Sequence, residues 1–387
     1  MGNLSFFSVR HGLIPTEQNL NYDLYINSSS IKDKEKFIKV FAQGDVLTKT
    51  DLDEFQRKYH QLYVSESQRK KFFKSLVKST TIDEVDKVSV LKDSALDYLQ
   101  NIFESKKEFS TELLSQNIEG CRDVVESMID VLEDNDIDGL RNLITNLSFH
   151  DFYTYDHSIN VCMYCISIYK VIHPQASRSE LMHAGLGGLL HDLGKIKIPT
   201  HILNNPGGLS NEDYQEIKKH PDFGLDLLLS GHCDIDQEID LKIIGRVIHE
   251  HHENFDGTGY PNKLKGRDEI HVLARICTIA DFFDAITTKR SYNEVLPLTE
   301  AMNTMRKFKG VKLDPDFFDI FDHHVGYVRH EIHRDLKLLD SFDPTLPYAK
   351  LPLEDLGKFK KELDFGKIKV VETKKVQDKD KDKKEKK

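Results

Sequence analysis

The chain has 387 residues, a formal net charge of −10 at pH 7, 39% hydrophobic residues and 30% charged residues. This composition excludes a membrane channel and a wholly disordered chain, and the length predicts two or three domains. The negative charge argues against a protein that binds nucleic acid polymers. No apolar run is long enough for a transmembrane helix, and five cysteines without a signal-peptide pattern predict a cytoplasmic protein.

Residues 1–75 combine short apolar runs with turn-forming Asn, Ser and Gly, a pattern typical of small strands. The runs lie at residues 6–9, 24–26, 37–41 and 61–64. A helical spacing of apolar residues begins at Leu52. These features predict a small α+β domain, to which we assign a regulatory or sensor-like role.

The rest of the chain is predicted to be helical up to a charged tail. Residues 76–148 show apolar positions at helical spacing, such as Leu96 and Leu99, so we expect a helical connector there. Residues 149–345 are nearly all helical in pattern, which predicts a mainly α fold: a helical bundle preceded by the small α+β domain. Residues 346–387 end in a run of Lys, Asp and Glu, which predicts a solvated, disordered tail.

Histidines are concentrated in the predicted bundle, since 12 of the 18 lie between His150 and His271. The pair His191-Asp192 ends an apolar helical pattern and offers an imidazole nitrogen and a carboxylate to the same cation. The carboxylate has two oxygens and can bridge two metal ions. Lys195 follows one helical turn later, so its ammonium group can reach a phosphate near the metals.

Other candidate ligands lie at the edges of apolar helical patterns, where a bundle can bring them together in its core. A single histidine of this kind is more often a surface or capping residue, but the whole set favours a metal site. We expect His220 to end the segment Ser210–Lys219. The further candidates are His157, His251, His252, Asp281 and Asp284.

These residues occur within motifs that resemble the HD-GYP family, bacterial phosphodiesterases of cyclic di-GMP within the HD phosphohydrolase superfamily. The resemblance covers roughly residues 149–330, and the motifs follow the order that the family shows. The motifs are His191-Asp192-x-Gly-Lys195, Ile198-Pro199, His220-Pro221, His251-His252-Glu253, Asp256-Gly-Thr-Gly-Tyr260-Pro261 and Ala280-Asp281-Phe-Phe-Asp284-Ala.

The resemblance implies a centre of two divalent metal ions, iron or alternatively manganese, with Asp192 and Lys195 as catalytic residues. It also implies a cyclic dinucleotide site, with Asp284 either in contact with the substrate or orienting a metal-bound water or a ligand histidine. The implied metal ligands are His157, His191, Asp192, His220, His251, His252 and Asp281. The implied substrate-binding residues are Lys195, Tyr260, Asp284 and Arg290.

Two departures from the family pattern carry expectations of their own. Some members place a Glu one turn before the first histidine, where it helps to hold a third metal; this chain has Tyr153 there. We therefore expect two metal ions rather than three. The family usually reads Arg-Pro-Tyr-Lys after the last metal helix, but here Asn293 takes the place of the Lys. One phosphate-binding cation is therefore missing.

The predicted function is hydrolysis of cyclic di-GMP to linear pGpG, with GMP as a further product left open, by attack of a hydroxide that bridges the metals. One alternative is a catalytically weak receptor or adaptor for the dinucleotide, which Asn293 favours. A second alternative is a phosphodiesterase for another cyclic dinucleotide, such as cyclic GMP-AMP. The resemblance also names diguanylate cyclase (GGDEF) domains as candidate partners of the Gly-Tyr-Pro loop, and we carry a homodimer as a candidate assembly.

Overall fold

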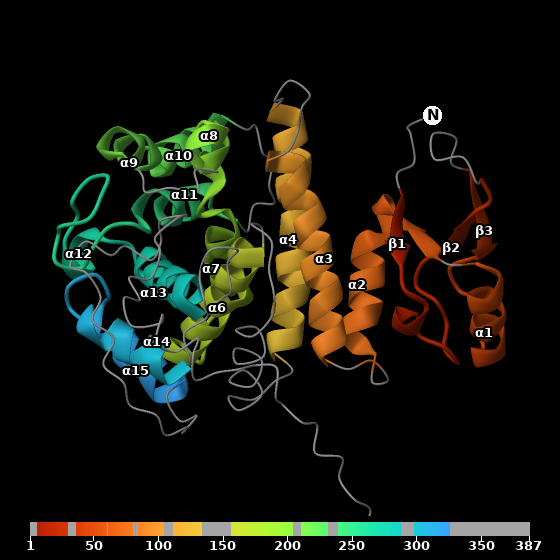
Figure 1. The fold of residues 1–387 in the computed structure, drawn as a ribbon. Coiled ribbons are helices and arrows are strands. Elements are labelled where there is room, and N and C mark those ends of the chain that lie inside the picture. The colour runs from red at the N-terminus through yellow and green to blue at the C-terminus, as the bar shows by residue number, and fades with distance from the viewer. Residues whose placement is uncertain are drawn as a thin grey trace, which may run out of the picture.

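The computed structural model describes most of the chain between residues 6 and 325. Its described residues are 6–29, 36–59, 61–79, 82, 84–103, 111–133, 156–203, 210–230, 239–287 and 298–325. A small sheet lies at one end, two long helices follow it, and a larger group of helices lies on their far side (Figure 1). The sheet and the larger helical group therefore lie on opposite sides of the helix pair.

The N-terminal region is a four-stranded sheet in the order β1-β4-β2-β3, with antiparallel pairing throughout. One face of β2 is buried, because Leu24 and Ile26 alternate with partly exposed neighbours. Its elements are β1 (Phe6–Val9), β2 (Leu24–Asn27), β3 (Phe37–Phe41), α1 (Lys49–Lys58), β4 (Leu62–Ser65) and α2 (Arg69–Lys78), with short 3-10 turns at His11–Leu13 and Glu66–Gln68. The predicted small α+β region is confirmed.

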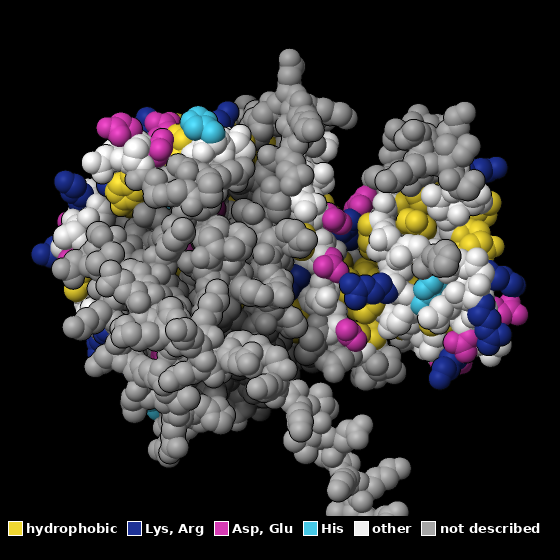
Figure 2. All heavy atoms as spheres, in the orientation of Figure 1, with side chains coloured by type: hydrophobic (Ala, Val, Ile, Leu, Met, Phe, Trp, Pro, Cys, Tyr) yellow, Lys and Arg dark blue, Asp and Glu magenta, His cyan; other side chains and the backbone are white. Residues whose placement is uncertain are grey.

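Helix α2 holds the sheet through aromatic packing. The Phe72 ring lies 5.5 Å from the Phe7 ring and 5.3 Å from the Tyr22 ring, and all three side chains are buried. The helix continues past residue 75, where the sequence predicted the first domain to end. The face of this region drawn in Figure 2 carries side chains of both charge signs among hydrophobic ones, rather than a uniformly basic surface.

Helices α3 (Glu84–Phe103) and α4 (Thr111–Glu133) lie side by side between the sheet region and the larger helical group (Figure 1). On one side α4 packs against α2, and on the other it packs against α6 (Asp156–Ile172) and α7 (Arg178–Leu190). Its inward face is a stripe of buried apolar residues that includes Val124, Met128 and Leu132. The helix pair thus shares one continuous hydrophobic core with both neighbours.

The remaining helices form the predicted bundle, and the mainly α fold is confirmed. Its centre is α13, in which every residue from Leu273 to Thr287 is buried, packed against α6, α7 and α11. The helices are α6 (Asp156–Ile172), α7 (Arg178–Leu190), α8 (Thr200–Leu203), α9 (Asn211–Ile217), α10 (His220–Ser230), α11 (Leu241–Glu250), α12 (Gly266–Glu269), α13 (Val272–Thr287), α14 (Leu298–Lys307) and α15 (Pro315–Val325), with the 3-10 turn η3 at Leu193–Lys197.

One predicted helix boundary is wrong. His220 does not end the segment that begins at Ser210, because α9 stops at Ile217 and His220 is the first residue of α10. The physical reason is Pro221, which has no backbone N–H and is favoured in the first turn of a helix, where that group has no intrahelical partner.

No helix among the described residues is both long enough and apolar enough to span a bilayer.

Candidate metal centre

Three histidines of the bundle are held in the same way by the backbone. His191, His220 and His251 each place Nδ1 2.8 Å from the carbonyl oxygen three residues earlier in the chain. Because a carbonyl oxygen can only accept, Nδ1 carries the proton in each ring, and the Nε2 lone pair remains available. This arrangement prepares each Nε2 atom to bind a metal ion.

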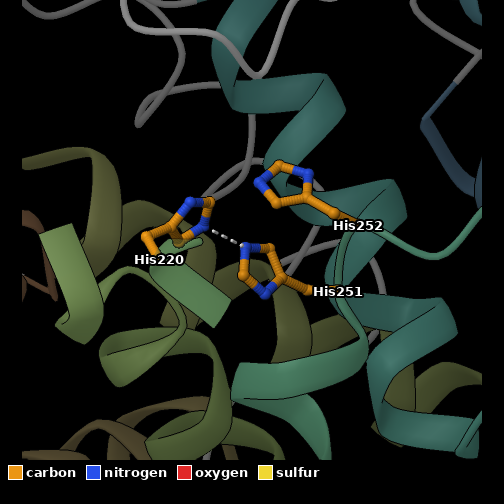
Figure 3. A group of neighbouring side chains, drawn as sticks. All are labelled: His220, His251 and His252. Carbon is orange, nitrogen blue, oxygen red and sulfur yellow. Dashed lines mark hydrogen bonds between the residues drawn. The ribbon is translucent and has the colours of Figure 1, made fainter. Parts of the chain in front are cut away.

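His220, His251 and His252 form the first candidate ligand group (Figure 3). Their nitrogen atoms lie within 4.8 Å of one another, and the Nε2 atoms of His220 and His251 are 3.2 Å apart. Both of these Nε2 atoms carry lone pairs, because the Nδ1 protons are used by the backbone. Two lone pairs that face each other in a buried site repel, unless a cation lies between them. The geometry therefore fits a metal ion.

His157, His191 and Asp192 form the second candidate ligand group. The buried Nε2 atom of His191 lies 3.3 Å from Oδ2 of Asp192 but makes no hydrogen bond of normal geometry among the described residues. His157 places Nε2 3.0 Å from Oδ1 of Asp281, so this carboxylate adjoins the same group. Imidazole and carboxylate donors without thiolate suit iron or manganese.

Asp192 belongs to the second group and lies between its His191 and the His220 of the first group. Its Oδ1 atom is 3.5 Å from Nε2 of His220, and its Oδ2 atom is 3.3 Å from Nε2 of His191. Lys195 places Nζ 2.5 Å from Oδ2. A carboxylate with one oxygen directed toward each ligand group has the geometry of a metal bridge, the role that the sequence predicted for this residue. All seven predicted ligands are brought together by the fold.

Burial keeps three of the candidate ligand histidines, His220, His251 and His252, neutral. It lowers the pKa of His220 to about 4, and burial together with the neighbouring histidines holds the pKa values of His251 and His252 well below the ordinary value of 6.5. Burial raises the pKa of Asp192, but the adjacent His191 and Lys195 outweigh it, so the pKa falls well below its ordinary value. At neutral pH the groups are therefore neutral imidazoles and an ionised carboxylate, which are the forms that bind metal.

We expect the metal-free protein to lose stability as the pH falls from about 6.5 to about 4. In this range the unfolded chain protonates His220 and the folded chain does not, so proton binding favours unfolding. The loss from this residue alone is about 3 kcal/mol, because each pH unit between the two pKa values is worth about 1.4 kcal/mol. Urea unfolding midpoints, measured with a chelator across this range, test it. A His220→Gln variant should show a shallower pH dependence, and an equal slope would contradict the prediction.

Asp284 lies behind His157 and is fully buried. Its Oδ2 atom is 2.7 Å from Nδ1 of His157, and its Oδ1 atom accepts a hydrogen bond of 2.9 Å from Nδ2 of Asn160. This position favours orientation of the ligand histidine over contact with a substrate. Asn160 was not among the predicted site residues. Its sequence signal is its position three residues after His157, on the same side of α6.

The loop with the Gly-Tyr-Pro motif packs directly on the ligands. The Tyr260 ring stacks on the His252 imidazole, with centroids 4.7 Å apart. Glu253 holds the loop in place, because its carboxylate accepts hydrogen bonds from the backbone N–H groups of Asn262 and Leu264. The sequence motif contains Glu253, but no role was predicted for it. Tyr260 thus limits the position of His252, while Glu253 fixes the shape of the loop.

Three residues that carry sequence predictions lie outside the described residues. They are Tyr153, Arg290 and Asn293. The expected absence of a third metal and the expected weak phosphate contact depend on them, so both remain predictions.

This chain also resembles known proteins. Residues 154–317 match the family model of the HD domain. The chain is 36% identical over 183 residues to the cyclic di-GMP phosphodiesterase PA4108 of Pseudomonas aeruginosa. The aligned segment covers 47% of this chain and 42% of that protein. It is 30% identical over 168 residues to the 3'3'-cGAMP-specific phosphodiesterase 2 of Vibrio cholerae, which covers 43% of this chain and 31% of that protein. This chain thus spans less than half the length of either relative.

Among solved structures, the HD-GYP-like protein Bd1817 of Bdellovibrio bacteriovorus matches 83% of this chain and all of its own, with a TM-score of 0.51 and 19% identity. This likeness shows a shared fold. The family resemblance read from the sequence is confirmed by the match to the HD domain model and by the identity to PA4108. Residues 154–317 of this chain therefore match the HD domain family, and this part of the chain holds both candidate ligand groups.

Proposed function

We propose that this chain hydrolyses a phosphodiester bond of a cyclic dinucleotide, with cyclic di-GMP as the substrate and linear pGpG as the product. The observation that carries the proposal is the position of Asp192, with one oxygen directed toward each of the two ligand groups. Two divalent ions bound there supply Lewis acidity and a nucleophile at neutral pH. Relatives that carry the same domain are named as cyclic di-GMP phosphodiesterases, which supports the substrate.

The protein's own residues prepare the centre for a phosphodiester anion. The predicted ligands comprise five histidines, taken here as neutral, and two aspartates, so two divalent ions leave a net positive charge that attracts the phosphate. Lys195 adds a further positive charge beside the bridging carboxylate, and its side chain is 18% exposed. Its ammonium group can therefore stabilise the negative charge that develops on the phosphate in the transition state. Asp284 holds the His157 ring at Nδ1, while Asp281 lies 3.0 Å from the other ring nitrogen, Nε2, on the side of the candidate ligands.

A second substrate is supported by a separate observation. Over 168 residues the chain is 30% identical to a relative named for its specificity toward 3'3'-cGAMP. Cyclic GMP-AMP presents the same phosphodiester ring and differs in one base, so the metal centre does not distinguish the two. Discrimination would have to come from residues that contact the bases.

The test is an anaerobic purification, followed by loading with Fe²⁺ or Mn²⁺ and chromatographic analysis of products. We expect pGpG from cyclic di-GMP, and two metal ions per chain by elemental analysis. Faster turnover of cyclic GMP-AMP would transfer the proposal to that substrate. Tight binding of either dinucleotide without product in the metal-loaded protein would replace the enzyme by a receptor. Absence of bound metal would remove the basis of the proposal.

A further inference from the structure

A buried lysine outside the HD domain reaches the network that holds the metal centre. Lys92 on α3 is 9% exposed, and its Nζ donates a hydrogen bond of 2.8 Å to Oδ1 of Asn160 on α6. The Nδ2 atom of Asn160 then donates to Asp284 on α13, and Asp284 lies 2.7 Å from Nδ1 of His157. Three helices thus contribute to one continuous chain of hydrogen bonds that ends at a candidate metal ligand.

The chemistry of these groups allows the hydrogen bonds in this series to run in only one direction, from Lys92 toward Asp284. An ammonium group can only donate, and an ionised carboxylate can only accept. The amide of Asn160 must therefore direct its oxygen toward Lys92 and its nitrogen toward Asp284. Lys92 fixes the orientation of this amide, and the amide in turn holds Oδ1 of Asp284.

Lys92 and Asp284 place opposite charges at the two ends of the Asn160 amide. A buried ammonium group and a buried carboxylate are each costly unless a partner compensates them. Only the side-chain amide of Asn160 lies between the charges of Lys92 and Asp284 along this chain, and each end of it is within hydrogen-bond distance. Removing Lys92 would leave the amide oxygen of Asn160 without this donor. The carboxylate of Asp284 would also lose the positive charge at the other end of this series of hydrogen bonds.

We propose that Lys92 is a positioning residue of the metal centre, acting through Asn160 and Asp284 on the ring of His157. The inference rests on the proposed metal centre. It also has a wider consequence, because α3 precedes residues 154–317, which match the HD domain. The helical region before the domain therefore sets the geometry of one metal ligand, so a displacement of α3 changes the affinity of the centre.

The test compares two buried lysines of the same helix. Lys92→Met removes the ammonium group and keeps an unbranched apolar side chain of similar length. Lys87→Met is the matched control, because Lys87 is 5% exposed on α3 and donates to the carbonyl oxygen of Val77, at the end of α2. Mn²⁺ is titrated into metal-free protein. We expect about tenfold weaker binding of one ion in Lys92→Met, at the lower end of the effect of outer-sphere partners, and no change in Lys87→Met.

A second readout does not require metal or activity. In metal-free protein with ¹⁵N-labelled histidine, the proton of His157 between Nδ1 and Asp284 should shift upfield in Lys92→Met and stay unchanged in Lys87→Met. Lys92→Arg keeps a charged donor and should restore Mn²⁺ affinity to within about threefold. In an Asp284→Asn background, Lys92→Met should have no further effect on either readout, because the series of hydrogen bonds from Lys92 to His157 is already interrupted.

The proposal is overturned if Lys92→Met matches the wild type in both Mn²⁺ affinity and the His157 resonance. It is also overturned if Lys87→Met produces the same losses, since the effect would then be general to α3. Should Lys92→Met fail to fold, Lys92→Gln removes the charge while keeping a polar side chain, and it should show the same loss of affinity. A wild-type protein that binds Mn²⁺ but does not hydrolyse a cyclic dinucleotide would contradict the proposed function and leave this inference standing.

Discussion

Replacing Asp192 with asparagine should abolish hydrolysis and reduce bound metal while leaving the chain folded. The substitution replaces one of the two oxygens that face the ligand groups with an NH₂ group, which cannot bind a metal ion, and removes a negative charge from the centre. Two-metal stabilisation of a phosphoryl transition state is worth several kcal/mol, so turnover should fall by roughly a thousandfold or more. Product formation with Mn²⁺-loaded protein and elemental analysis measure the two effects.

The matched control is Asp222→Asn. Asp222 also lies beside a histidine, since its Oδ1 accepts a hydrogen bond from Nε2 of His249 at 2.9 Å, but its side chain is 54% exposed and neither residue belongs to the two ligand groups. This variant should keep full activity and metal content. Circular dichroism should give both variants the wild-type helix content, because the buried apolar faces of α6, α7 and α13 are unchanged. Full turnover in Asp192→Asn would contradict the bridged centre.

Much of this fold could be predicted from local patterns. The four strands were predicted within one or two residues, since each is a short apolar run bounded by turn residues, as at Phe6–Val9. The candidate ligands that the fold brings together could also be selected from the sequence, because metal binding demands particular residue types, and these occur at the edges of apolar helices. His251, for example, directly follows the last residue of α11, as the sequence indicated.

Two supporting residues, Asn160 and Lys92, were not predicted, because their roles depend on contacts between distant segments. Asn160 and Asp284 are separated by 124 residues, and Lys92 and Asn160 by 68. Nothing in the pattern around Lys92 distinguishes it from other lysines, since a helix that is partly covered by a neighbour reveals its buried polar contacts only after the helices are placed. Glu253 is a different case. It adjoins two ligand histidines, but its bonds reach the backbone of the following loop, which a sequence pattern does not show.

We expect Gly194→Ala to disrupt the centre without removing any ligand. A Cβ atom at this position would lie 1.9 Å from the carbonyl oxygen of His220 and 2.5 Å from the backbone nitrogen of Gly224. Both contacts are with the backbone of α10, which cannot rotate away as a side chain can. The turn η3 and the start of α10 must therefore separate, and this moves His220 away from Asp192. The cost should be about 3 kcal/mol, at the upper end of the range for overpacked sites.

Thermal unfolding with and without Mn²⁺ tests this expectation. Gly194→Ala should lower the melting temperature and also reduce the stabilisation that Mn²⁺ provides, because a ligand group that has lost its geometry binds the ion more weakly. Gly12→Ala is the control, since a Cβ atom there meets no other atom within 4 Å. It should melt as the wild type does and retain the Mn²⁺ effect. If Gly194→Ala kept the wild-type response to Mn²⁺, the close approach of η3 to α10 would not be what places His220 beside the bridging carboxylate.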